Sequence, residues 1–238
     1  MGLIFAAFLF EPSRIGLFPK SDVFRGALIM LTRFLPYIGA MALIVVLSNY
    51  LVQFPVQYQL GGLALADLLT WGAFTYPAAF LVTDLTNRRF GVGGARLVVL
   101  VGFVIAVALS IWLASPRIAL ASGTAFLLAQ MLDVSIFDRF RSSVWWRGPL
   151  ISSVLGSFLD TALFFSLAFS AKLTFFGGVD VFAVESSPLL GVFAPEMPRW
   201  VSWALGDLGV KLLVALAMLV PYGLLRKRIG DGVTHPSA

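Results

Sequence analysis

The chain has 238 residues, of which 59% are hydrophobic and only 12% are charged. Soluble domains are about 25% charged and about 45–50% apolar, so this composition excludes a soluble globular enzyme, a disordered chain and a disulfide-stapled secreted domain. Cysteine is absent, and His235, the single histidine, lies in a polar tail. These counts argue against a Ser-His-Asp triad, a Cys nucleophile and a thiolate or histidine-rich metal site, so an enzyme would need an Asp-based or other metal mechanism. We expect no enzyme activity and no cofactor. A polytopic helical membrane protein remains.

Six segments are long and apolar enough to cross a bilayer, which needs roughly 20 mostly apolar residues. They predict an all-α membrane protein with six transmembrane helices. Pro77 removes a backbone donor inside the second segment, so we expect that helix to be broken there; a simple kink is the alternative. The segments cover residues 34–54, 62–83, 97–114, 118–137, 149–171 and 200–225.

We expect residues 34–225 to form one transmembrane domain, flanked by an N-terminal segment and a C-terminal tail. The apolar stretch Met1–Phe10 is too short to span and lacks the positive start of a signal peptide. It predicts an interfacial lead-in within an N-terminal segment of residues 1–33. Residues 226–238 form a tail.

Basic residues gather on one side of the predicted bundle. That side holds four groups: Arg14, Lys20, Arg25 and Arg33; Arg88, Arg89 and Arg96; Arg139, Arg141 and Arg147; and Arg226, Lys227 and Arg228. The opposite side holds Arg117, Lys172 and Arg199. Cytoplasmic loops of membrane proteins carry the excess of Lys and Arg, so both termini should be cytoplasmic and net charge +5 does not indicate nucleic-acid binding. The long outer loop 172–199 either covers a site or is a plain surface loop.

Charged residues inside a bilayer are costly and usually face a cavity or a partner. Asp67, Asp84, Asp133, Asp160, Asp207 and Lys211 fall in or at the edge of the spans. Asp207 and Lys211 are four residues apart, which places them on one helix face within ion-pair reach. We expect that they form a structural ion pair with each other, or pair with Asp160 on a neighbouring helix; a proton- or substrate-coupled pair is the alternative.

Polar residues also form stripes on other helices. Gln130 and Asp133 share a face, as do Ser157, Asp160 and Thr161. Such stripes predict a polar central cavity, although isolated polar pairs between helices would also explain them. Trp145, Trp146, Trp200 and Trp203 lie at the predicted boundaries, where an aromatic belt explains them.

Three ordered blocks carry a family resemblance across roughly residues 34–225. They are residues 75–87 (TYPAAFLVTDLTN), residues 129–134 (AQMLDV) followed by Phe137-Asp138 and Trp145-Trp146-Arg147, and Ser152-Ser153 leading to residues 159–164 (LDTALF). In this order they resemble the queuosine precursor transporter family of the YhhQ type, also called the vitamin uptake transporter (VUT) family. Two positions depart from the family pattern: Arg88 follows Asn87, and Ser157 stands where glutamine is frequent.

The resemblance implies a multi-pass inner-membrane importer of a 7-deazaguanine precursor of queuosine. The expected substrate is preQ0, with preQ1 as a second candidate; an importer or substrate-binding subunit for another purine-like or vitamin-like molecule is the alternative. A homo-oligomer and an energy-coupling ATPase partner stay open, because the chain has no ATP-binding motif. The expected substrate-binding residues are Asn49, Tyr76, Asp84, Asn87, Gln130, Asp133, Ser157, Asp160 and Thr161.

The chemistry of a deazaguanine suggests roles for these residues. Asp133 or Asp160 would accept from the ring N1–H and the exocyclic amine, while Gln130 and Asn49 would donate to the carbonyl. Tyr76, Phe80 or Phe164 could stack on the bicycle. We therefore expect Asp133→Asn or Asp160→Asn to abolish uptake without preventing insertion.

Overall fold

The structure is a computed structural model that describes residues 20–173 and 177–229, with side chains from residue 32 onward. The chain divides into two units, Met1–Pro36 and Tyr37–Ala238. The predicted lead-in Met1–Phe10, Arg14, the side chains of Lys20 and Arg25, and His235 lie outside the described residues.

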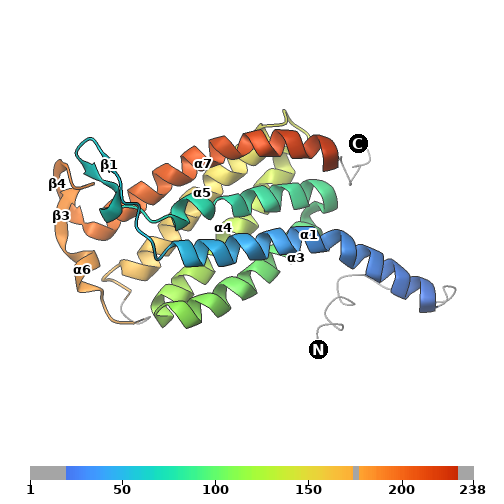
Figure 1. The fold of residues 1–238 in the computed structure, drawn as a ribbon, viewed down its shortest axis with the longest axis horizontal. Helices are drawn as coiled ribbons and strands as arrows, with labels where there is room; N and C mark the ends of the chain where they lie inside the picture. Colours follow the sequence, from blue (N-terminus) through green and yellow to red (C-terminus); the bar gives the residue numbers. More distant parts are fainter. Residues whose placement is uncertain (1–19, 174–176, 230–238) are drawn as a thin grey trace. The chain divides into compact units, whose positions relative to one another are not determined.

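Long helices dominate the described residues (Figure 1). They are α1 (Lys20–Leu51), α3 (Ala78–Leu113), α4 (Pro116–Phe140), α5 (Arg147–Phe169) and α7 (Arg199–Ile229). By length and composition, five helical segments can cross a membrane, and one of them, Gly72–Leu113, joins the predicted second and third spans. Both terminal helices extend beyond the predicted spans: α1 begins at Lys20, although its candidate span begins at Thr32, and α7 continues through the basic triplet to Ile229.

The joined segment reverses direction at Gly91. As one straight helix, its 42 residues would extend about 60 Å, twice the thickness of the hydrocarbon core. Gly91 instead has φ 74° and ψ −175°, a conformation essentially restricted to glycine. Before this residue, Thr83 bonds Gln130 and Asn87 bonds Val134, so the chain runs parallel to α4.

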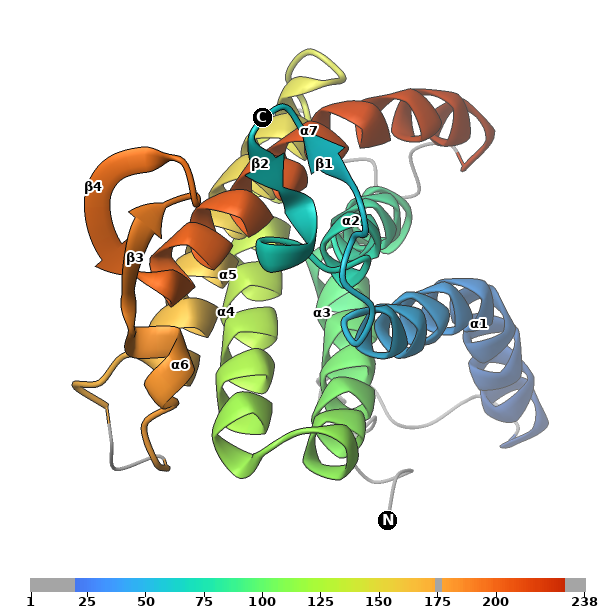
Figure 2. The same cartoon turned by 60° about the vertical axis from the view of Figure 1, so that its left-hand side comes forward.

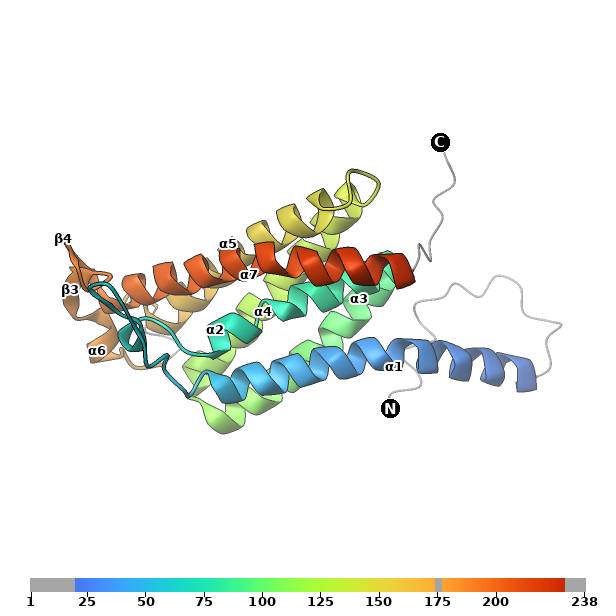
Figure 3. The same cartoon turned by 45° about the horizontal axis from the view of Figure 1, so that its top comes forward.

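Contacts after Gly91 run in the opposite order. A Cβ on Gly102 would lie 3.2 Å from the Phe126 ring, and Ser110 lies 3.4 Å from Ser122, both on α4. Figure 3 shows the two arms of α3 as a bent pair on one side of α4. Counted from the start of α2 at Gly72, the first arm has 19 residues up to Phe90 and the second has 22 after Gly91, each about the length of one bilayer crossing.

The second predicted span begins later than expected. Residues 59–64 form a hairpin of β1 (Gln59–Leu60) and β2 (Leu63–Ala64), followed by the short helix η2 (Leu65–Asp67). The helical segment starts with α2 (Gly72–Thr75) and is interrupted before Ala78, at the predicted Pro77. The interruption is tight, because Phe80 N–H donates to the Pro77 carbonyl at 3.1 Å.

The long outer loop is also partly ordered. Its elements are α6 (Val181–Val184), β3 (Ser186–Leu189) and β4 (Phe193–Pro198). The two strands pair antiparallel, and Figure 2 shows them beside the beginning of α7. Arg117 at the start of α4 donates to the carbonyls of Leu167, Ser170 and Gly178, which ties this loop to the helix ends.

Large apolar side chains cover the outside of the helices, which is the pattern of a multi-pass membrane protein. More than 60% of the surface is exposed in each of Leu43, Val104, Trp112 and Leu213. Such exposure of apolar side chains is unfavourable in water but favourable in lipid. The helices approach one another through small residues: a Cβ on Gly156 of α5 would lie 2.8 Å from the Phe80 ring.

The two ends of the bundle differ in charge and structure. We call the end with the two hairpins the loop end. The other end, called the arginine end, contains Gly91 and the α4–α5 connection and carries Arg88, Arg89, Arg139, Arg141, Arg147 and Arg226. Contacts close the arginine end: Arg141 donates to the Arg88 carbonyl, Arg89 donates to the Ile229 carbonyl at 3.1 Å, and Arg226 stacks on Trp145.

Candidate functional site

A cavity of about 900 Å³ extends from the loop end into the bundle. Residues of α1, α4, α5 and α7 line it together with both hairpin regions. Its polar lining includes Asn49 and Ser110, which lie 3.4 Å apart on α1 and α3. A cavity of this size is ample for a small heterocyclic molecule.

Five residues meet at the deep side of the cavity. We call them the lysine cluster: Tyr76, Asp160, Thr161, Asp207 and Lys211. Lys211 Nζ lies 2.6 Å from Asp160 Oδ2 and 2.5 Å from Asp207 Oδ2. The Thr161 hydroxyl donates to Asp207 Oδ2 at 2.9 Å and accepts from Lys211 at 3.2 Å. One ammonium therefore bridges two carboxylates, which leaves the cluster with a net negative charge.

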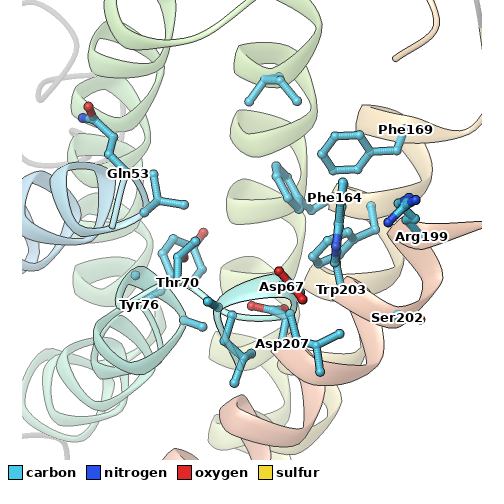
Figure 4. A pocket seen from close by; sticks show the side chains of 18 of the residues that line it. Gln53, Asp67, Thr70, Tyr76, Phe164, Phe169, Arg199, Ser202, Trp203 and Asp207 are labelled. Carbon is cyan, nitrogen blue, oxygen red and sulfur yellow. The ribbon is translucent and has the colours of Figure 1, made fainter. Parts of the chain in front are cut away.

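An aromatic face stands beside this cluster. The rings of Phe169 and Trp203 are 5.4 Å apart in an edge-to-face arrangement, and Phe182 lies 6.1 Å from Trp203. Figure 4 shows Phe164, Phe169 and Trp203 together on one wall, with Tyr76 on the other side of the space. An aromatic wall beside carboxylates can hold a flat, polar-edged molecule by stacking and hydrogen bonds.

A second group of polar residues lies outside the cavity, toward the arginine end. We call it the closed polar cluster: Thr83, Asp84, Asn87, Gln130, Asp133 and Ser152. All are at most 1% exposed. Thr83 donates to Gln130 Oε1 at 2.6 Å, and Asn87 donates to the Val134 carbonyl at 2.9 Å. The Ser152 hydroxyl lies 3.4 Å from Asp84 Oδ1.

Over most of its length, the sequence resembles proteins that are named as transporters. The model of a family described as "Putative vitamin uptake transporter" matches residues 70–115 and 110–225. The "Queuosine precursor transporter" of Escherichia coli (strain K12) is 34% identical over 215 residues, covering 79% of this chain and 86% of that protein. The "Probable queuosine precursor transporter" of Haemophilus influenzae (strain ATCC 51907 / DSM 11121 / KW20 / Rd) is 31% identical over 210 residues, covering 76% and 81%.

The chain belongs to the vitamin uptake transporter family. The resemblance of the three sequence blocks to this family is thus confirmed. No solved structure matches the chain.

The structure separates the predicted site residues of this vitamin uptake transporter into two groups. Asn49, Tyr76 and Asp160 line the cavity, and Thr161 is bonded to the lysine cluster beneath it. Asp84, Asn87, Gln130, Asp133 and Ser157 are fully buried and do not line it. We therefore assign no substrate contact to the second group.

Some cavity residues were not expected from the sequence of this transporter. Trp203 was interpreted as part of an aromatic belt, yet it lines the cavity. The sequence did not mark Phe169 and Phe182 as cavity residues, because phenylalanine is abundant throughout the chain. Asp207 and Lys211 were expected as a structural ion pair, and both also line the cavity. Neither departure from the family pattern, Arg88 or Ser157, lies on the cavity surface.

Proposed function

We propose that this protein imports a 7-deazaguanine precursor of queuosine across the inner membrane, with preQ0 as the first substrate to test and preQ1 as the second. The observation that carries the proposal is the 34% identity over 79% of the chain to a protein named queuosine precursor transporter. A cavity that combines carboxylates with an aromatic wall supports it, because a deazaguanine is flat and has two adjacent N–H donors on one edge.

In this proposal Asp160 is the main acceptor for the substrate edge. Its Oδ2 is held by Lys211 at 2.6 Å, which fixes the carboxylate beside the cavity, where it would accept from the ring N1–H or the amine. Asp207 contributes the second negative charge of the cluster. A base that lacks these donors would leave buried carboxylate oxygens unpaired, which is a large penalty.

The other contacts follow from the position of the cluster. Trp203 and Phe164 would stack on the bicycle from one side, and Tyr76 would border it from the other. Asn49 would donate to the carbonyl of the base from α1. Each of these side chains lines the same cavity.

We further propose six membrane crossings, with both arms of α3 counted separately and both termini cytoplasmic. The reversal at Gly91 supports the count, because it gives the 42-residue segment two antiparallel arms. The basic residues at the arginine end support the orientation, since cytoplasmic loops are enriched in Lys and Arg. The cavity would then face the outside in this conformation, through the loop end.

The proposal is tested by complementation of a host that lacks both queuosine synthesis and its own importer. Cells expressing the wild-type chain receive low preQ0 or preQ1, and their tRNA is scored for queuosine. We expect restored modification with the wild type and none with Asp160→Asn at equal membrane expression. Absence of restoration by a well-expressed wild type with either precursor would refute the proposed substrate.

A further inference from the structure

The closed polar cluster contains two carboxyl groups without a cation. Asp84 of α3 and Asp133 of α4 are 1% and 0% exposed. The Thr83–Gln130 bond at 2.6 Å and the Asn87–Val134 bond at 2.9 Å flank the two residues and hold their helices together at this level. Among the side chains that the structure describes, no Lys or Arg forms an ion pair with either one. The contrast with Asp160 and Asp207 is direct, because those two carboxylates share Lys211.

Several atoms of this region have unmet hydrogen-bonding capacity. Both carboxyl oxygens of Asp133 are buried without a donor, and the Gln130 amide nitrogen, one turn earlier on the same face of α4, is buried without an acceptor. Among the described residues, the hydroxyl of Ser152 is the one side-chain donor to Asp84, at 3.4 Å. Leaving two facing carboxylates ionised in such a place is costly, and one shared proton removes a charge and creates the missing hydrogen bond.

We propose that Asp84 and Asp133 form a proton-binding site that couples substrate import to the proton gradient. The inference rests on the proposed function. One proton binds the pair from the outer side and leaves it toward the cytoplasm with each substrate molecule, so the pair returns to its starting charge. A metal ion suits the pair poorly, since hard cations take six or more oxygen ligands and the described residues contain no group of three metal-ligating side chains.

The position of the pair suits this role. The pair lies between the cavity and the contacts that close the arginine end. Its two helices, α3 and α4, both contribute residues to the cavity lining. The charged and titratable groups nearest to the pair are Tyr222 of α7 and Arg88 of α3, whose side chains lie 3.4 Å apart. From α5 the pair is faced by Ser152, which carries no charge. Opening of the arginine end would therefore give the pair a path to the cytoplasm.

The test uses the purified full-length chain in liposomes with labelled preQ0. Exchange of internal for external preQ0 at equal pH needs no net proton movement, whereas accumulation under an acidic-outside gradient does. For the wild type we expect exchange, and accumulation that vanishes when the pH gradient is collapsed. For Asp84→Asn and Asp133→Asn we expect exchange without gradient-driven accumulation. Asp138→Asn, near the arginine end, is the matched control and should accumulate like the wild type.

The outcomes separate the two proposals. A wild type that neither exchanges nor accumulates preQ0 or preQ1 contradicts the proposed function, whereas exchange without any response to pH contradicts the proton site alone. Accumulation driven by a sodium gradient, or retained by both Asn variants, also overturns the proton site. Infrared spectra give a readout without substrate: the wild type should show a protonated-carboxyl band that Asp133→Asn loses, and an unchanged band contradicts the inference.

Discussion

Lys211 of α7 and Asp160 of α5 meet at the bottom of the cavity, with 2.6 Å between Nζ and Oδ2. Both side chains are about 95% buried, so the charges depend on each other and on Asp207. Removing one member of a buried ion pair is much more costly than removing an exposed one. Asp160 and Lys211 therefore both line the cavity and hold α5 and α7 together.

Lys211→Met should destabilise the bundle strongly. Without the ammonium, two carboxylates are left facing each other, and the cost is about 3–5 kcal/mol. Glu185→Gln breaks the exposed pair with Arg199, 2.9 Å apart, and should cost less than about 1 kcal/mol. Thermal unfolding in detergent measures both. Equal melting temperatures for the two variants would contradict the structural importance of the lysine cluster.

Trp203→Ala should weaken substrate binding without unfolding the protein. Stacking of a base on an aromatic ring is worth about 1–3 kcal/mol, which corresponds to a rise in KM for uptake of roughly 5- to 150-fold. Trp112, which is 83% exposed on the outside of α3, provides the control. Trp112→Ala should leave KM unchanged, and a similar KM for both variants would remove Trp203 from the site.

Gly91→Ala should disturb the reversal between the arms of α3. A side chain at φ 74° and ψ −175° is strained by about 1–3 kcal/mol. Gly93→Ala is the matched control, because a Cβ there meets nothing within 4 Å. We expect a lower melting temperature for Gly91→Ala alone. An equally stable Gly91→Ala variant would contradict the turn described here.

Because the chain has no cysteine, single introduced cysteines can map its topology directly. Gly93→Cys and Ser142→Cys, at the arginine end, should react with an impermeant thiol reagent only from the cytoplasmic side. Val192→Cys, on the β3–β4 hairpin, should react only from outside. Labelling of Gly93→Cys and Ser142→Cys from opposite sides would exclude the six-crossing arrangement.

The sequence predicted the helical regions well because apolar runs of sufficient length have few alternatives in a membrane. The predicted start of the second span, at residue 62, is too early. The hairpin residues 59–64 and the loop up to Trp71 are almost as apolar in composition as a membrane-spanning helix. The sequence predicted two spans, 62–83 and 97–114, with a connection between them. It could not show that this connection is helical except at Gly91, because that depends on the backbone angles of one residue.

The polar residues show a similar division. The spacing of four between Asp207 and Lys211 was sufficient to predict their pairing. Whether a polar residue lines the cavity depends on how the helices pack, which spacing within one helix does not determine. Asp133 and Asp160 therefore look alike in the sequence, although only Asp160 lines the cavity.

The central claim is that the cavity binds a 7-deazaguanine through Asp160. Equilibrium binding of labelled preQ0 to the purified chain in detergent tests it most directly, with Asp160→Asn and Asp138→Asn compared at equal folded concentration. We expect saturable binding by the wild type and Asp138→Asn, displaced by unlabelled preQ0, and at least a tenfold loss of affinity in Asp160→Asn. Equal affinity in Asp160→Asn would show that the substrate binds elsewhere.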